Sequence, residues 1–259
     1  MESLARRTVL TSLAQAIAGL PLAAVLADPR RARAAASGLE SVSLTMPGDL
    51  KVDAALAVPD QTPAAAVLLV HEWWGLNDQI KSVAAALAKQ GYLALAVDLY
   101  GGKVATTPDD ARSYMGQVEP ARATETLAAW LDWLRREPRA TGEIGTVGWC
   151  FGGGWSLNAA LARPVQATVV YYGRVDKTAA DLAPLSGPVL GHFATRDGWI
   201  DDKMVGRFEK AMDAAGKPYQ SHWYEADHAF ANPTSARYDA ADAALAWQRT
   251  LAFFEAHLG

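Results

Sequence analysis

Residues 148–153 read Gly-Trp-Cys-Phe-Gly-Gly, and this stretch decides the fold because it sets the only cysteine of the chain in a frame of glycines. Residues 142–147 have the pattern of a short strand, and residues 154–162 have that of an apolar helix. A nucleophile with a glycine two residues away on both sides is typical of a sharp strand-to-helix turn, because only glycine lets the two elements approach so closely. We therefore expect Cys150 at the carboxyl end of a strand and the amino end of a helix.

This position bears on the chemistry of Cys150. The amino end of a helix favours negative charge, so a thiol placed there is expected to ionise readily. The competing interpretation is a small, buried and unreactive cysteine in a glycine-rich turn. The glycine frame favours the catalytic interpretation.

The composition is that of an ordinary globular enzyme. The chain has 259 residues, of which 51% are hydrophobic and 20% charged, and this is enough for one α/β domain with a full core. A net charge of −4 offers no basic surface, so we expect no nucleic-acid partner. A single cysteine excludes both an intramolecular disulfide and a cysteine-rich metal cluster.

Residues 1–36 are expected to be an export signal. Arg6 and Arg7 are followed by residues 8–27, which carry no charge, and small residues recur up to Ala36. This order resembles a twin-arginine signal, so the sequence predicts a periplasmic protein with no membrane association once it is processed. Two alternatives stay open: a cytoplasmic protein, if the signal does not function, and a membrane anchor, which is disfavoured by Gln15, Gly19 and Pro21.

Residues 37–259 are expected to form a single α/β domain, because strand and helix patterns alternate along them. A hairpin over residues 41–58 opens the domain. The further strands are expected at residues 65–70, 92–97, 145–147, 167–172, 188–194 and 219–224. The helices are expected at residues 78–90, 107–115, 120–136, 201–215 and 238–257. Strands separated by helices indicate a mainly parallel central sheet with helices on both faces.

A thiol nucleophile needs a base within hydrogen-bond reach, and the base needs a carboxylate to orient it. In α/β-hydrolases the chain order is nucleophile, acid, histidine. Asp197 and His228 follow Cys150 in that order, and each comes after an expected strand, so all three should meet at one edge of the sheet. Asp227 is the rival acid, but an immediate neighbour cannot easily face the imidazole of His228.

The other histidines and the segment after the first core strand complete the expected site. His192, His222 and His257 are poorer candidates because they lie in strand patterns or at the end of the last helix. Residues 71–75 read His-Glu-Trp-Trp-Gly, where an oxyanion-hole loop is expected, so the backbone N–H groups of Trp73 and Phe151 are the expected donors. No second histidine follows at the spacing of a zinc protease, so we expect no metal and no cofactor.

Together these segments resemble the dienelactone hydrolase family, the cysteine branch of the α/β-hydrolases. The likeness covers residues 40–257, and its motifs are residues 71–77, 97–100, 148–153, 171–173 and 222–231. It implies an α/β-hydrolase fold, with hydrolysis of a lactone or an activated carboxylic ester through a thioester. It also implies a role for Glu72, a carboxylate that pairs with the resting thiol and takes its proton when substrate binds. The alternative for Glu72 is a structural salt bridge or cap.

The resemblance also bears on substrate binding. Members that act on dienelactone have an arginine four residues after the catalytic histidine, where this chain has Asn232. This difference indicates another or a less acidic substrate. Arg112 is the candidate for a second anchoring arginine. Aromatic residues close to Cys150 in sequence or at strand ends are expected to wall an apolar pocket, namely Trp149 and Trp199 with Trp73 and Phe151.

The main hypothesis is therefore a monomeric cysteine hydrolase whose partner is a small lactone or ester. A second hypothesis is a non-catalytic protein that binds an apolar ligand on the same scaffold, suggested by the missing arginine and the tryptophans. Redox use of the thiol ranks last, because no second cysteine is present to resolve an oxidised form.

Overall fold

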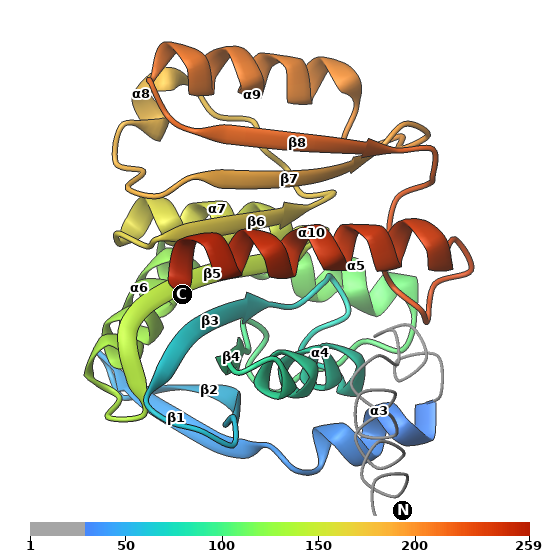
Figure 1. The fold of residues 1–259 in the computed structure, drawn as a ribbon. Coiled ribbons are helices and arrows are strands. Elements are labelled where there is room, and N and C mark those ends of the chain that lie inside the picture. Colours follow the sequence, from blue (N-terminus) through green and yellow to red (C-terminus); the bar gives the residue numbers. More distant parts are fainter. Residues whose placement is uncertain (1–28) are drawn as a thin grey trace, which may run out of the picture.

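The computed structural model describes residues 29–259, which form an eight-stranded sheet with helices on both faces (Figure 1). The order across the sheet is β1-β2-β4-β3-β5-β6-β7-β8. The strands are β1 (Glu40–Met46), β2 (Leu50–Ala57), β3 (Ala64–Val70), β4 (Leu93–Val97), β5 (Ala140–Trp149), β6 (Ala167–Tyr171), β7 (Val189–Ala194) and β8 (Tyr219–Tyr224). The pairs β1–β2 and β2–β4 are antiparallel and all other pairs are parallel, which confirms the predicted sheet.

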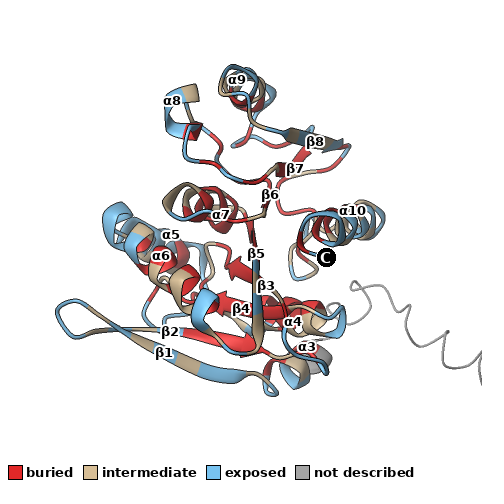
Figure 2. Cartoon of the chain, turned by 60° about the vertical axis from the view of Figure 1, so that its left-hand side comes forward, coloured by how far each residue is buried: buried red, intermediate tan, exposed pale blue. Residues whose placement is uncertain are grey.

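The helices divide into two layers (Figure 2). They are α3 (Pro29–Ala36), α4 (Asp78–Lys89), α5 (Pro108–Gly116), α6 (Pro120–Arg136), α7 (Phe151–Ala162), α8 (Ala179–Leu182), α9 (Asp202–Ala214) and α10 (Ala240–Leu258). Helices α6, α7 and α9 pack on one face of the sheet, and α4 and α10 pack on the other. Strand β3 shows why its sequence is continuously apolar: Leu68 and Val70 belong to the first core and Val67 and Leu69 to the second.

The turn at Cys150 has the geometry that the glycine frame predicts. Cys150 has φ 54° and ψ −117°, a conformation that side chains rarely adopt. A Cβ at Gly148 would overlap the backbone of Gly152, and a Cβ at Gly152 would overlap the carbonyl oxygens of Val70 and His71. The first turn of α7 therefore lies directly against the ends of β3 and β5, with the strained residue between them.

Two elements begin or end differently from the expectation. Helix α7 begins at Phe151 rather than near residue 154, so it includes three successive glycines. Glycine has a low helix propensity. Here, close packing of the glycine backbone against β3 and the segment after β6 stabilises the helix in place of side-chain contacts. Strand β5 begins at Ala140, before both residue 142, where the strand pattern starts, and residue 145, where the core strand was expected, and its first residues are half-buried or exposed.

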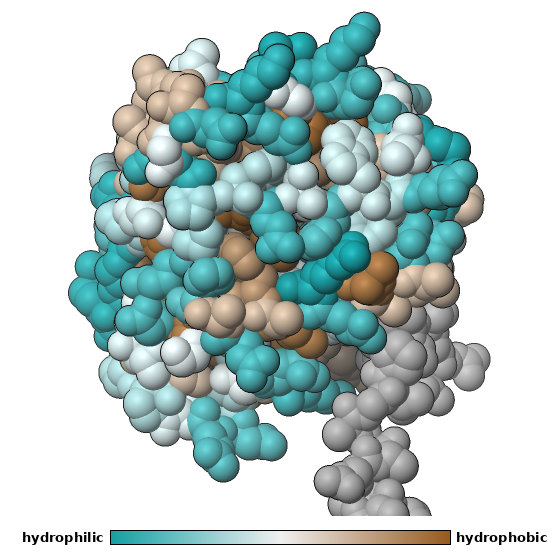
Figure 3. Space-filling view, turned by 45° about the horizontal axis from the view of Figure 1, so that its top comes forward, coloured by the Kyte–Doolittle hydropathy of each residue, from teal (hydrophilic) through white to brown (hydrophobic). Residues whose placement is uncertain are grey.

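The amino-terminal part of the described chain packs on the domain. Helix α3, which falls within the predicted export signal, lies beside α4 with Ala32 and Ala36 buried. Residues 1–28, which hold the paired arginines and the uncharged run, lie outside the described residues. Within the described part, no helix combines the length and the apolar character that crossing a bilayer requires. The face of the molecule shown in Figure 3 is mostly hydrophilic, with hydrophobic residues visible in separate patches between polar ones.

The close packing at the turn predicts that Gly152→Ala destabilises the protein by about 3 kcal/mol, because the added methyl must displace backbone oxygens. Gly206, in the middle of α9, is the matched control because a Cβ there meets no atom within 4 Å. Gly206→Ala is expected to stabilise by about 0.5–1 kcal/mol. Urea unfolding of both variants measures the difference, and equal stability of the two would contradict the packing described for α7.

Candidate active site

A cavity of about 820 Å³ opens where β3, β5, β6, β7 and β8 end. It is lined by Glu72 and Trp73 after β3, by Cys150 and Phe151 at the turn, and by His228 after β8. Parallel sheets bind ligands at the carboxyl ends of their strands, and the cavity lies at that edge of the sheet.

The sulfur of Cys150 faces two backbone donors. The backbone N–H groups of Phe151 and Trp73 lie close enough to the sulfur to lower the pKa of the thiol. The backbone N–H of Cys150 itself is bound to the carbonyl oxygen of Tyr171 at 3.0 Å, which ties the turn to β6. The two N–H groups named from the sequence as oxyanion donors thus converge on one point in the cavity.

The thiol is harder to ionise than the sequence suggested. Burial is the largest cause and, with the charges of Glu72 and Asp197, raises the pKa of Cys150 to about 12. The N–H groups of Phe151 and Trp73 act in the opposite direction but do not outweigh burial. The expectation of a readily ionised thiol was therefore wrong for the resting protein, in which Cys150 is protonated at neutral pH.

His228 and Asp197 form a close pair. His228 Nδ1 lies 2.6 Å from Asp197 Oδ2, and both side chains are buried. The other oxygen, Asp197 Oδ1, accepts hydrogen bonds from the backbone N–H groups of Trp199 at 2.8 Å and Ile200 at 3.1 Å. The carboxylate is thus fixed by the turn after β7. The rival Asp227 instead faces Arg196 Nε, at 3.4 Å.

Glu72 is a buried carboxylate between several polar partners. Tyr172 OH donates to Oε1 at 3.3 Å, and the Asn232 amide donates to Oε2. Burial raises the pKa of Glu72 above its ordinary value, although these hydrogen bonds and the charge of His228 lower it in part. A carboxylate of raised pKa is a better proton acceptor than an exposed one.

Asn232 lines the cavity, but both the oxygen and the nitrogen of its side-chain amide are already hydrogen-bonded within the protein. The backbone N–H and the hydroxyl of Thr234 donate to Asn232 Oδ1 at 2.9 and 2.7 Å, which leaves the NH₂ group to face Glu72. The residue that replaces the arginine of the dienelactone-cleaving members therefore orients Glu72.

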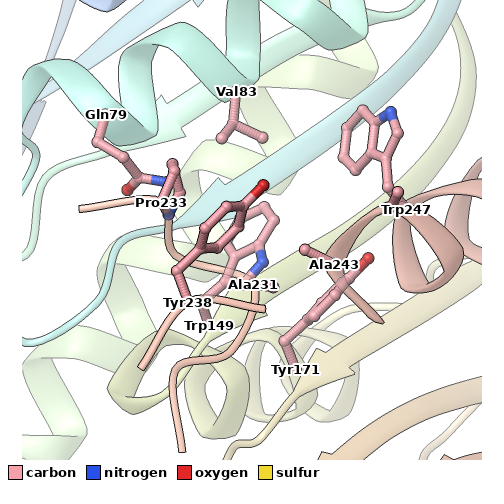
Figure 4. Close-up of a pocket in the computed structure, with 10 residues that line it drawn as sticks. Gln79, Val83, Trp149, Tyr171, Ala231, Pro233, Tyr238, Ala243 and Trp247 are labelled. Carbon is pink, nitrogen blue, oxygen red and sulfur yellow. The ribbon is translucent and has the colours of Figure 1, made fainter. Parts of the chain in front are cut away.

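Arg112 and Trp199 line the cavity as expected, but Trp149 does not. Arg112 lies at the rim on α5 with its guanidinium 2.8 Å from Asp109. Trp149, the last residue of β5, is buried in the core between the sheet and helices α4 and α10. There it lines a small separate cavity of about 30 Å³ with Tyr171 and side chains of α4 and α10 (Figure 4). The placement of Trp149 in the substrate pocket was wrong.

Tyr172 and Arg237 are among the lining residues that the sequence analysis did not name as site residues. Tyr172 has φ 34°, and its buried ring lies 5.1 Å from that of His228 while its hydroxyl reaches Glu72. It directly follows β6, so the rule that selected Asp197 and His228 could have found it. Arg237 lies with its guanidinium carbon 5.3 Å from the centre of the Trp199 ring, and Trp199 contacts His228 edge-on. Loop folding places Arg237 there, and no local sequence pattern marks it.

A mainly parallel sheet, a nucleophile at a strand-to-helix turn and an acid–histidine pair after later strands define the α/β-hydrolase class. The sequence profile described as the dienelactone hydrolase family matches residues 52–258. The chain belongs to the dienelactone hydrolase family, and it is a hydrolase of the lactone and carboxylic-ester class.

Individual relatives agree with this membership. A carboxymethylenebutenolidase from Pseudomonas putida is 30% identical, over 75% of this chain and 87% of its own length. A protein of Methylorubrum extorquens is 33% identical, over 97% of this chain and 93% of its own. A crystal structure from Klebsiella pneumoniae is 26% identical with a TM-score of 0.74, covering 84% of this chain and 99% of its own.

The high pKa predicts how Cys150 reacts with iodoacetamide. Because the thiolate is the reactive form, alkylation of the free enzyme should rise about tenfold per pH unit from pH 7 to 10 without a plateau. Glu72→Gln removes a negative charge beside the sulfur, so the pKa of Cys150 falls and alkylation at pH 8 becomes several-fold faster.

Glu143→Gln is the control, because Glu143 is exposed near the start of β5 and should leave the alkylation rate unchanged. Rates are followed by mass spectrometry. A plateau of the native rate below pH 8, or no acceleration in Glu72→Gln, would contradict the electrostatics described.

Proposed function

We propose that this protein hydrolyses lactones or activated carboxylic esters through a thioester on Cys150. The observation that carries the proposal is the convergence of the Cys150 sulfur, two backbone N–H donors and the His228–Asp197 pair on one cavity. The carboxymethylenebutenolidase of Pseudomonas putida, named for a lactone, supports this substrate class.

The first half of the reaction forms the thioester. Glu72 accepts the proton of the thiol, and the thiolate adds to the substrate carbonyl carbon, whose π electrons move to the oxygen. The N–H groups of Phe151 and Trp73 stabilise that oxyanion, at about 3 kcal/mol for each donor. His228, paired with Asp197, then donates a proton to the leaving alkoxide as the carbon–oxygen bond breaks.

The second half releases the acid and restores the site. Neutral His228 takes a proton from water, and the hydroxide adds to the thioester carbon. Collapse of this second oxyanion breaks the carbon–sulfur bond, and the thiolate recovers the proton that Glu72 held. Cys150 is again a thiol, Glu72 again a carboxylate, and His228 has regained from water the proton that it gave to the alkoxide, so protons balance over the cycle.

Good leaving groups fit this arrangement best. Thiolates expel alkoxides of low basicity readily, whereas the amine of an amide leaves poorly, so esterase and lactonase activity is favoured over peptidase activity. Trp73, Phe151 and Trp199 supply aromatic surface for the substrate. Because the Asn232 amide is committed to Glu72 and Thr234, it is not a clamp for a substrate carboxylate. A non-catalytic binding protein would need none of these polar groups, and the comparisons do not favour it.

We predict that Cys150→Ala lowers kcat/KM for an aryl acetate or an enol-lactone by at least about 10⁴-fold, because it removes the nucleophile. His228→Ala should lower it by a comparable factor. The control is His257→Ala at the end of α10, remote from the cavity lining, which should retain native turnover. Native turnover by Cys150→Ala under the same steady-state assay would exclude the proposal.

We also propose that residues 1–36 direct export to the periplasm and that the processed protein is a monomer. Intact-mass measurement on protein from a periplasmic fraction should then show a chain beginning near residue 37, and light scattering should give the mass of one chain. A chain that begins near residue 29 would instead show that α3 is retained on α4. Full-length protein confined to the cytoplasm would contradict the export proposal.

A further inference from the structure

The peptide unit between Glu72 and Trp73 contributes to the site through its N–H, which lies close enough to the Cys150 sulfur to lower the pKa of the thiol. Its carbonyl oxygen is held from the other side. His71 Nδ1 lies 2.6 Å from the Glu72 carbonyl oxygen, and the backbone N–H of Gly75 donates to the same oxygen at 3.2 Å. His71 is fully buried and is not among the residues that line the substrate cavity, so it does not touch substrate.

The neighbours of His71 decide which of its nitrogens carries the proton. The backbone N–H of Leu99 points at His71 Nε2 from 3.2 Å, and an amide can only donate. Nε2 is therefore the acceptor, and the proton of the neutral ring lies on Nδ1, where it donates to the Glu72 carbonyl. Burial lowers the pKa of His71, which keeps the ring neutral at the pH at which the thiol chemistry operates.

These contacts form two hydrogen bonds in series that lead to the peptide beside the nucleophile. Leu99 N–H donates to the imidazole, and the imidazole donates to the Glu72 carbonyl. The Trp73 N–H of the same peptide lies close enough to the Cys150 sulfur to lower the pKa of the thiol. Donation to a peptide carbonyl fixes the plane of the peptide and polarises its N–H, so each bond in such a series strengthens the next.

The ring of His71 also packs against the second oxyanion donor. Its centroid lies 5.8 Å from that of Phe151 with the planes 21° apart, and Tyr100 contacts it edge-on at 4.6 Å. The carbonyl oxygen of His71 lies less than 3.0 Å from the position that a Cβ on Gly152 would take, so this segment packs closely against the start of α7. His71 is thus packed between both halves of the predicted oxyanion hole.

We infer that His71 is a positioning residue of the oxyanion hole: its Nδ1–H orients and polarises the Glu72–Trp73 peptide whose N–H stabilises the transition state. This inference rests on the proposed thioester mechanism and adds a residue to it. Its effect should be confined to steps in which negative charge develops on the substrate oxygen. Removing this N–H donor should therefore lower kcat and leave the KM for a small ester largely unchanged.

Two substitutions separate this role from a merely structural one, because each keeps one of the two hydrogen bonds of the ring. The Nδ2 of an asparagine occupies the place of Nδ1, so His71→Asn keeps the donor to Glu72 and loses the acceptor for Leu99. The Oε1 of a glutamine occupies the place of Nε2, so His71→Gln keeps the acceptor and loses the donor. Each variant leaves a buried backbone group without one partner, so similar losses of stability are expected.

The experiment compares kcat, KM and melting temperature of both variants with those of the native enzyme, using an aryl acetate. His71→Gln is expected to lose about tenfold in kcat, a fraction of the 10²–10³-fold typical of a deleted oxyanion donor. His71→Asn is expected to stay within about threefold of native at a similar melting temperature. Affinity for a trifluoromethyl ketone, which adds to the thiol to form a tetrahedral oxyanion, should fall in His71→Gln by the same factor as kcat/KM.

Equal losses in the two variants, or a greater loss in His71→Asn, would overturn the inference. Cys150→Ala is assayed alongside to keep two failures apart. If Cys150→Ala is inactive while His71→Gln is native, the positioning role is wrong and the hydrolase mechanism stands. If Cys150→Ala turns over substrate normally, the thioester mechanism itself is wrong.

Discussion

The fold and the site both depend on the contact between the first turn of α7 and the ends of β3 and β5. Cys150 occupies a strained conformation there because the backbones around it lie too close for side chains at Gly148 and Gly152. The strain is local, whereas the packing that enforces it extends over both core layers. The same contact that bends the chain at the sulfur also brings the β3 segment, with its N–H donor, against it.

This contact explains why one segment supplies several functions. Residues 71–73 follow β3 directly, and they provide a buried imidazole, a buried carboxylate and a backbone donor within three positions. Because α7 is pressed onto this segment, small changes there would move the carboxylate and the donor together. The raised pKa of the thiol follows from the same crowding, since burial and the Glu72 charge both favour the protonated form. A proton acceptor close to the sulfur is therefore part of the chemistry.

The sequence predicted what depends on chain order and periodicity. Alternating strands and helices define a parallel sheet, and residues placed after β5, β7 and β8 must meet at one edge, which locates Cys150, Asp197 and His228 together. Prediction from the sequence failed where the outcome depends on side-chain packing or on opposing electrostatic effects in the folded chain. Trp149 packs in the core beneath α4 and α10 although it adjoins Cys150 in sequence, and the helix dipole at Cys150 is outweighed by burial that only the folded chain reveals. The role of the Asn232 amide depends on Thr234, which no pattern singles out.

Direct observation of the covalent intermediate tests the central claim. The protein is mixed with an aryl acetate, quenched in acid within milliseconds and digested for peptide mass spectrometry. The account predicts one acetyl group on the peptide that contains Cys150, removed by neutral hydroxylamine as a thioester should be. Substrate turnover with the acetyl group on another residue, or with no acylated peptide at any time under conditions that trap thioesters, would contradict it.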